Sequence, residues 1–152
     1  MRIQAIAVFT DFSENANIAV DQAFDIARRY EAELSVVHVV SPVLEQVVTD
    51  SSHGLIPQET KKAVMADIEE RMAKLHLRGK KEGVTVSHDI IGGHVSTEIL
   101  SYIYCMKIDL AILGAFGLSG MGLVLFGSVA KRVAHRAPCS VMIVRDKEKP
   151  PA

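Results

Sequence analysis

The most informative segment of the sequence is LGAFGLSGMGLVLFGSV, residues 113–129. Five of the ten glycines of the chain lie in it, so its backbone can turn more freely than that of any other segment of this length. The apolar run before it, Asp109–Leu113, has the length and composition of a buried strand. The residues after it, Ser128–His135, have helical spacing, and Ser128 is placed to cap the first turn. We therefore expect a glycine-rich loop between a strand and a helix.

A loop of this kind is a common binding site for phosphate. Its N–H groups can approach an anion closely, and the helix start adds unpaired donors and a favourable dipole. The spacing Gly114-x2-Gly117-x9-Gly127-Ser128 matches neither G-x-x-x-x-G-K-[ST] nor G-x-G-x-x-G. Two interpretations stay open on these grounds: a phosphate site, or a flexible turn that only lets the helix pack on the sheet.

The length and composition indicate one globular domain, residues 1–152, with a loose tail from about residue 146. The net charge of −1 gives no basic surface for nucleic acid or an anionic membrane. No apolar run reaches the length of a membrane span, and the N-terminus reads as a strand and not as a signal peptide. The two cysteines, Cys105 and Cys139, are isolated, which is typical of a reducing compartment. We expect a cytoplasmic protein without nucleic-acid or membrane partners.

Apolar runs and helical stripes alternate along the chain. The expected strands are Ile3–Phe9, Glu33–Val40, Val84–Ile91, Asp109–Leu113 and Ser140–Val144. The expected helices are Ala16–Tyr30, Gln58–Glu82, Thr97–Tyr104 and Ser128–His135, and Ser41–Thr60 is a long irregular segment. This alternation predicts an α/β fold: a three-layer, doubly wound parallel sheet of five strands with helices on both faces. Ligands bind such sheets beyond the carboxyl ends of the strands, where the strand order reverses. Asp11 and Gly114 face each other there if the first and fourth strands are neighbours.

Further motifs are spread along the chain. The first strand runs into Phe-Thr-Asp-Phe-Ser with Asp11, and the second ends in Val36-Val37-His38-Val39. A loop Gly93-His94-Val95 precedes Glu98-Ile99, and Ala137-Pro138-Cys139-Ser140-Val141 opens the last strand. Together with the glycine pattern, these motifs resemble the universal stress protein family over nearly the whole length. The pattern G-x2-G-x9-G-S is the one that marks the ATP-binding branch of that family.

The resemblance implies the strand order 3-2-1-4-5, a homodimer formed through the last strand, and an adenine nucleotide in the crevice, ATP with or without Mg²⁺. It places Asp11 at the adenosine end and Val39 along the adenine pocket. The remaining cofactor-binding residues that it implies, around the ribose and phosphates, are Gly114, Gly117, Gly127, Ser128 and Val129. The chain departs from the family at Phe9 and Val95, where proline is usual, and at Ala115-Phe116, where polar or basic side chains are frequent.

Two other functions remain open. One is a homodimeric, stress-related interaction protein of the same fold that binds no nucleotide. The other is a slow ATP hydrolase, although we expect no catalytic residues because the loop holds no lysine and no paired acid and base can be assigned. A metal site is not expected either, because the six histidines show no paired ligand spacing.

Several side chains have an ordinary structural interpretation beside the functional one. Asp11 either contacts the ligand or only caps the helix that follows, and Ser128 can do both. His38 is expected to be a hydrogen-bonded core histidine. Met106 is expected to fill the core, and Arg78 to lie on a solvated helix face.

Overall fold

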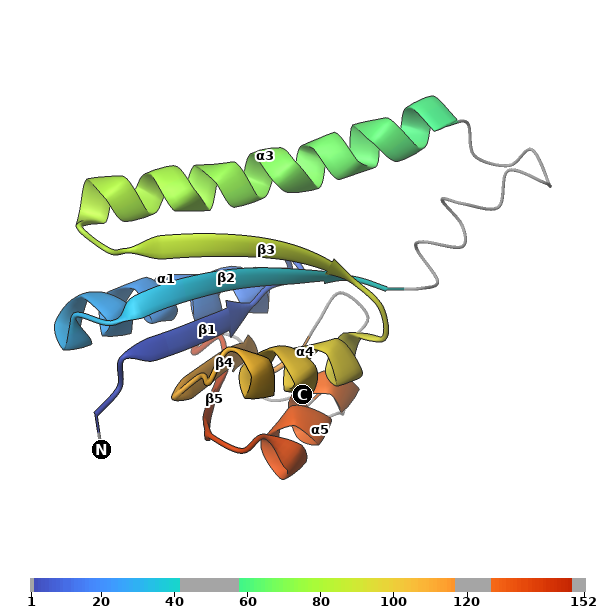
Figure 1. Ribbon diagram of the computed structural model, residues 1–152. Helices are drawn as coiled ribbons and strands as arrows, with labels where there is room; N and C mark the ends of the chain where they lie inside the picture. Colours follow the sequence, from blue (N-terminus) through green and yellow to red (C-terminus); the bar gives the residue numbers. More distant parts are fainter. Residues whose placement is uncertain (1, 42–57, 117–126, 149–152) are drawn as a thin grey trace.

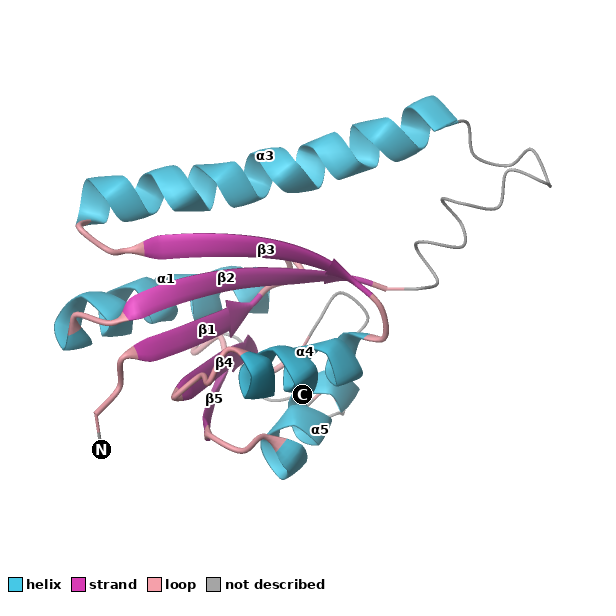
Figure 2. Cartoon of the chain, in the orientation of Figure 1, coloured by secondary structure: helices cyan, strands magenta, loops and turns pink. Residues whose placement is uncertain are grey.

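The structure is a computed structural model that describes residues 2–41, 58–116 and 127–148. Within these ranges, five strands form one sheet with helices on both sides (Figures 1 and 2). The strands are β1 (Ala5–Phe9), β2 (Glu33–Val40), β3 (Val86–Gly92), β4 (Leu110–Gly114) and β5 (Ser140–Val144). The helices are α1 (Glu14–Tyr30), α3 (Gln58–Glu82), α4 (Val95–Cys105) and α5 (Ser128–Arg136).

The sheet has the order β3-β2-β1-β4-β5, and all four strand pairs are parallel. β1 lies in the centre, where Ile6 is opposite Leu34 of β2 on one side and Leu110 of β4 on the other. A central parallel strand is covered on both faces, which is why β1 is a continuous apolar run without alternation. The doubly wound α/β fold and the strand order expected from the sequence are confirmed.

The sheet separates two hydrophobic cores. Helices α1 and α3 cover one face and α4 and α5 cover the other (Figure 1). Successive residues of each strand point to opposite faces, so alternate positions enter different cores. The core beneath α1 and α3 includes Ile6, Val8, Phe24, Leu34, Val36, Met72 and Ile112. The core beneath α4 and α5 includes Ala7, Phe9, Val37, Ile99, Ile103, Ala111, Leu113 and Val133.

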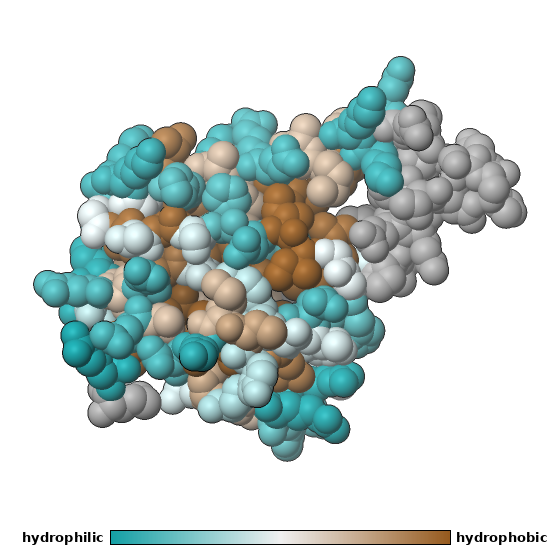
Figure 3. Space-filling view, viewed as in Figure 1, coloured by the Kyte–Doolittle hydropathy of each residue, from teal (hydrophilic) through white to brown (hydrophobic). Residues whose placement is uncertain are grey.

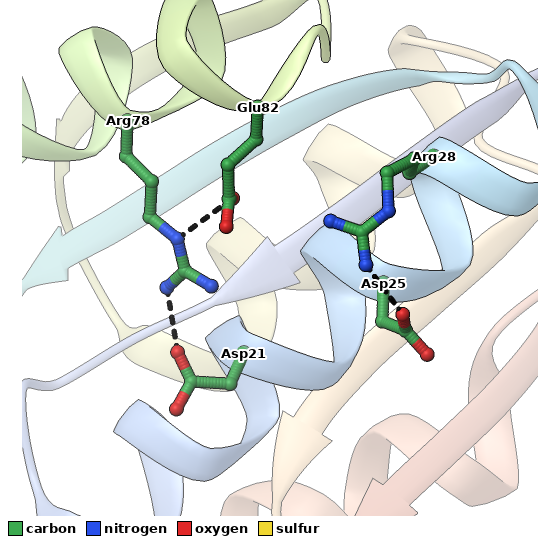
Figure 4. Close-up of polar contacts among 5 residues, drawn as sticks. All are labelled: Asp21, Asp25, Arg28, Arg78 and Glu82. Carbon is green, nitrogen blue, oxygen red and sulfur yellow. Dashed lines mark hydrogen bonds and ion pairs between the residues drawn. The ribbon is translucent and has the colours of Figure 1, made fainter.

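Arg78 joins the two helices on the first face. Its guanidinium donates to Asp21 on α1 and to Glu82 one turn further along α3, the latter at 2.9 Å (Figure 4). The same group lies over the ring of Phe24, 4.2 Å from its centre, at the edge of the core. The expectation that Arg78 lies on a purely solvated face is therefore wrong, because Asp21 and Phe24 belong to another helix.

Tyr102 ties α4 to the outer strand β3. Its hydroxyl donates to the Asp89 carboxylate at 2.7 Å, and its side chain is buried. Burial, together with the hydrogen bond to Asp89 and its negative charge, raises the pKa of Tyr102 to about 12. The phenol is thereby held in its protonated, donating form.

Some element ends differ from the expected ones. The third strand begins at Val86 and not at Val84, because the Val84 N–H donates to Gly79 O at 2.9 Å in the turn after α3. Met106 follows the last residue of α4 and is 52% exposed, so the expectation that it fills the core is wrong.

Candidate functional site

The candidate site lies at the carboxyl ends of β1 and β4, where the strand order reverses. From β1 the chain winds outward to β2 and β3, then returns to the other side of β1 for β4 and β5. Such a reversal leaves a gap between the loops that leave the two central strands. Asp11 follows β1 and Gly114 ends β4, so both lie at this edge of adjacent strands, as the sequence predicts.

The loop from β1 to α1 is held by hydrogen bonds between residues that are close in the sequence. The Phe12 N–H donates to Thr10 Oγ1, and the Ser13 N–H donates to Asp11 Oδ1, both at 3.0 Å. Ser13 is the N-cap of α1, and its hydroxyl accepts from the Ala16 N–H at 3.3 Å. The capping role considered for Asp11 thus belongs to Ser13. Asp11 is half-buried, and one of its oxygens fixes the turn that leads into the helix.

Phe12 connects this loop to two other elements. Its backbone is left-handed, with φ of 63°, which is unusual for a bulky residue. Its ring lies 4.8 Å from the ring of His38 on β2, and the guanidinium of Arg71 on α3 lies 5.3 Å from its centre. His38 Nδ1 is 2.7 Å from the Thr10 carbonyl oxygen in the buried interior, which confirms the hydrogen-bonded core histidine. Arg71 was not expected here, because no local pattern links α3 to this loop.

Gly114 has a packing role. A Cβ at this position would lie 2.9 Å from the Asn15 carbonyl carbon and 3.0 Å from the Ala16 nitrogen, which are backbone atoms at the start of α1. The end of β4 can therefore approach α1 this closely only with glycine. The glycine pattern of the loop does not by itself indicate that Gly114 is needed for packing against α1.

The ends of the glycine-rich loop come together in space. The Gly127 N–H donates to Ala115 O at 2.7 Å, and the Ala115 N–H donates to Val144 O at 2.8 Å. Gly117 falls outside the described residues, so its predicted role has no structural test. Gly127 is the N-cap of α5, and Ser128 is the first residue of the helix. The expectation that the Ser128 side chain caps the helix is wrong, because the helix starts one residue earlier than that role requires.

The two valines of the predicted site lie on the same side of the sheet. Val39 of β2 and Val129 in the first turn of α5 are both half-buried against the core beneath α4 and α5. Along the sheet, Val39 is opposite Ile91 of β3. The structure therefore gives both side chains a packing role and leaves their contact with a ligand as a prediction.

A basic residue that the sequence did not predict for the site lies near the glycine-rich loop. Arg145 follows β5, and its guanidinium is 6.0 Å from the centre of the Phe116 ring. Because β4 and β5 are paired, the residues that follow them meet at the same edge. The strand order, which pairs β4 with β5, was the available signal.

Two features of the described residues bear on the kind of site. They contain no group of three or more His, Cys, Asp or Glu side chains that could hold a metal ion. None of the helices within the described ranges is long and apolar enough to cross a membrane.

The fold and the crevice define a doubly wound α/β protein with its candidate site where the strand order reverses. The profile of the universal stress protein family matches residues 2–145. The chain belongs to this family. A universal stress protein of Methanocaldococcus jannaschii is 30% identical over 146 residues, covering 95% of this chain and 83% of the relative. A universal stress protein of Bacillus subtilis is 30% identical over 145 residues, covering 91% of this chain and 96% of the relative.

Solved structures show the same fold. Hypothetical protein MJ0577 superposes with a TM-score of 0.79 at 22% identity, covering 98% of this chain and all of the other. A universal stress protein in complex with cAMP has a TM-score of 0.69 at 25% identity, and the match covers 95% of this chain and 98% of that one. One from Archaeoglobus fulgidus in complex with dAMP has a TM-score of 0.65 at 19% identity, covering 95% and 99%. At such identities, the first and third support the fold alone.

Proposed function

We propose that the chain is a cytoplasmic stress-response protein that binds an adenine nucleotide, ATP with or without Mg²⁺, at the carboxyl ends of β1, β2 and β4. The observation that carries this proposal is the position of Asp11 and the glycine-rich loop on adjacent strands where the strand order reverses. The cAMP and dAMP complexes of family members support an adenine nucleotide as the ligand class.

The first turn of α5 supplies suitable donors for the phosphates. Its first intrahelical bond runs from the Lys131 N–H to Gly127 O, so the N–H groups before Lys131 have no partner within the helix. The Ser128 side chain is exposed beside them, and Ser128 is not the N-cap of the helix. In the proposed complex, these donors and the loop backbone contact the phosphates, Asp11 the adenosine end and Val39 the adenine.

We do not expect the chain to hydrolyse ATP efficiently. The loop between Gly114 and Gly127 contains neither lysine nor arginine, so it lacks the charge clamp that accelerates phosphoryl transfer. We expect the nucleotide to act as a bound ligand and not as a substrate, so that the protein responds to whether its site is occupied.

The direct test is to denature the purified protein and look for released adenine nucleotide by chromatography. In parallel, the nucleotide-free protein is melted with and without millimolar ATP and Mg²⁺. A ligand at a hundredfold excess over its Kd stabilises the folded state by about 2.7 kcal/mol. No released nucleotide together with an unchanged melting curve would contradict nucleotide binding.

The second candidate is a homodimeric interaction protein of the same fold that binds no nucleotide. Gly114 favours it, because the packing of α1 accounts for this glycine without any ligand. Ala115 and Phe116 also provide no side-chain donor to phosphate. The same melting experiment separates the two functions, because the second predicts a dimer that does not respond to ATP.

A further inference from the structure

The exposed side of α5 is strongly cationic. Its exposed residues include Lys131, Arg132, His135 and Arg136, and the nine residues of the helix contain no carboxylate. None of these four side chains forms an ion pair within the described ranges. The cations on the other face of the sheet differ, because many are paired with carboxylates: Arg28, Arg29, Arg71, Lys74 and Arg78. Figure 3 shows hydrophilic surface at the bottom of the view, where α5 lies in Figure 1.

Exposed apolar side chains lie near the end of the neighbouring helix. Tyr104 in the last turn of α4 is 76% exposed, and Met106 just after it is 52% exposed. Helix α4 leads into β4 and α5 leads into β5, and these two strands are paired. Both helices therefore end at the amino edge of the β4–β5 pair, away from the nucleotide crevice.

A hollow lies between the two connections at this edge. It has a volume of about 460 Å³ and is lined by Ile108, Asp109, Pro138, Cys139 and Ser140. Ile108 and Asp109 lead into β4, and the other three lie around the start of β5. Its lining is partly apolar and partly polar, and it is open to solvent.

We propose that the cations of α5, the exposed end of α4 and this hollow form one docking surface, the α4–α5 surface, for an acidic segment of another protein. Charge complementarity selects an anionic partner, since these cations have no carboxylate of their own nearby in the helix. Tyr, Met and Arg are enriched at protein interfaces, and an apolar anchor of the partner would enter the hollow. The hollow and the exposed end of α4 lie at the edge of the sheet opposite the nucleotide site, and α5 runs from one edge to the other.

The charge part is tested with a fluorescein-labelled peptide, a run of glutamates interrupted by one phenylalanine, in an anisotropy titration. The native chain is expected to bind it with an affinity that falls as salt rises. The double variant Arg132→Ala/Arg136→Ala should bind about tenfold more weakly. Lys80→Ala/Lys81→Ala is the matched control, since these exposed cations lie in the last turn of α3 on the other face. Circular dichroism confirms that each variant is folded.

The apolar part is tested at two positions. Tyr104→Ser should weaken peptide binding severalfold, while Tyr30→Ser, at an exposed tyrosine that ends α1, should leave it unchanged. In a Cys105→Ser background, the peptide should also slow maleimide labelling of Cys139, which lines the hollow. Replacing the phenylalanine of the peptide by serine should remove this protection.

Several results would overturn the proposal. One is equal binding of the peptide to the Arg132→Ala/Arg136→Ala variant and to the native chain, and another is unchanged labelling of Cys139. Tighter binding of an oligothymidylate, or of phosphatidylserine vesicles, would identify nucleic acid or a membrane as the partner instead. Protection of Cys139 that rises with protein concentration without peptide, and does so equally in a variant with Ile143→Lys in the edge strand β5, would identify a second copy of the chain as the occupant of the hollow.

Discussion

At the scale of single residues, two positions of the glycine pattern have different roles. Gly114 is required by the close approach of β4 to the start of α1. Ser128 has an exposed side chain and is not the N-cap of α5. The same motif thus contains one position explained by packing and one that packing does not explain.

Gly114→Ala is expected to lower the free energy of unfolding by about 1–3 kcal/mol, because the new methyl group overlaps backbone atoms of Asn15 and Ala16. Urea denaturation of the nucleotide-free protein measures this effect. The loss is expected in the absence of any ligand. A variant as stable as the native chain would show that α1 moves away without cost, and the packing explanation of Gly114 would then be wrong.

Ser128→Ala tests the other position. Removing one hydroxyl contact to a phosphate should weaken ATP binding by about 1–2 kcal/mol, or roughly five- to thirtyfold in Kd. The free energy of unfolding should change by less than about 0.5 kcal/mol, since no cap is lost. Calorimetric titration and urea denaturation measure the two effects, and Ser101→Ala at an exposed site on α4 is the control. A variant that loses stability but keeps its ATP affinity would restore the capping role.

At the scale of elements, the contact between α4 and β3 makes stability depend on pH. The folded state raises the pKa of Tyr102 to about 12, above the value of about 10 for an unfolded chain. The stabilisation is therefore complete below about pH 10 and is lost as the pH rises toward 12.

We expect the free energy of unfolding to fall over this range, and to fall less steeply in Tyr102→Phe. Urea denaturation at a series of pH values is the measurement. Tyr104→Phe, at an exposed tyrosine of the same helix, is the matched control. Identical slopes for the native chain and Tyr102→Phe would show that Tyr102 is not the group responsible.

The sequence predicts elements better than it predicts their contacts. The bounds of β2, α3 and β5 are as expected, because apolar runs and helical stripes are local signals. The left-handed backbone of Phe12 and the position of Arg71 over its ring depend on elements far apart in the chain. Local spacing therefore could not predict these contacts, although the alternation of strands and helices did place Asp11 and Gly114 at one edge.

At the scale of the whole molecule, β5 is an outer strand of the sheet, and Val141, Met142 and Ile143 are only half-buried. An exposed apolar edge strand favours pairing with another strand. We expect a homodimer through β5, as the family resemblance implies. Light scattering at tens of micromolar should give the dimer mass for the native chain and a monomer for Ile143→Lys. Ser87→Lys, at an exposed position of the other outer strand β3, should remain dimeric. A monomeric native chain would contradict this assembly.

The most direct test of nucleotide binding is calorimetric titration of ATP into the nucleotide-free protein and two loop variants. Gly117→Val alters a glycine of the G-x2-G-x9-G-S pattern, whereas Gly122→Val alters a loop glycine outside it. The native chain and Gly122→Val should bind ATP at one saturable site. Gly117→Val should show almost no heat, because its side chain occupies space that the phosphates need. Circular dichroism must show all three folded. A folded Gly117→Val protein that binds ATP as tightly as the native chain would contradict the phosphate-binding loop.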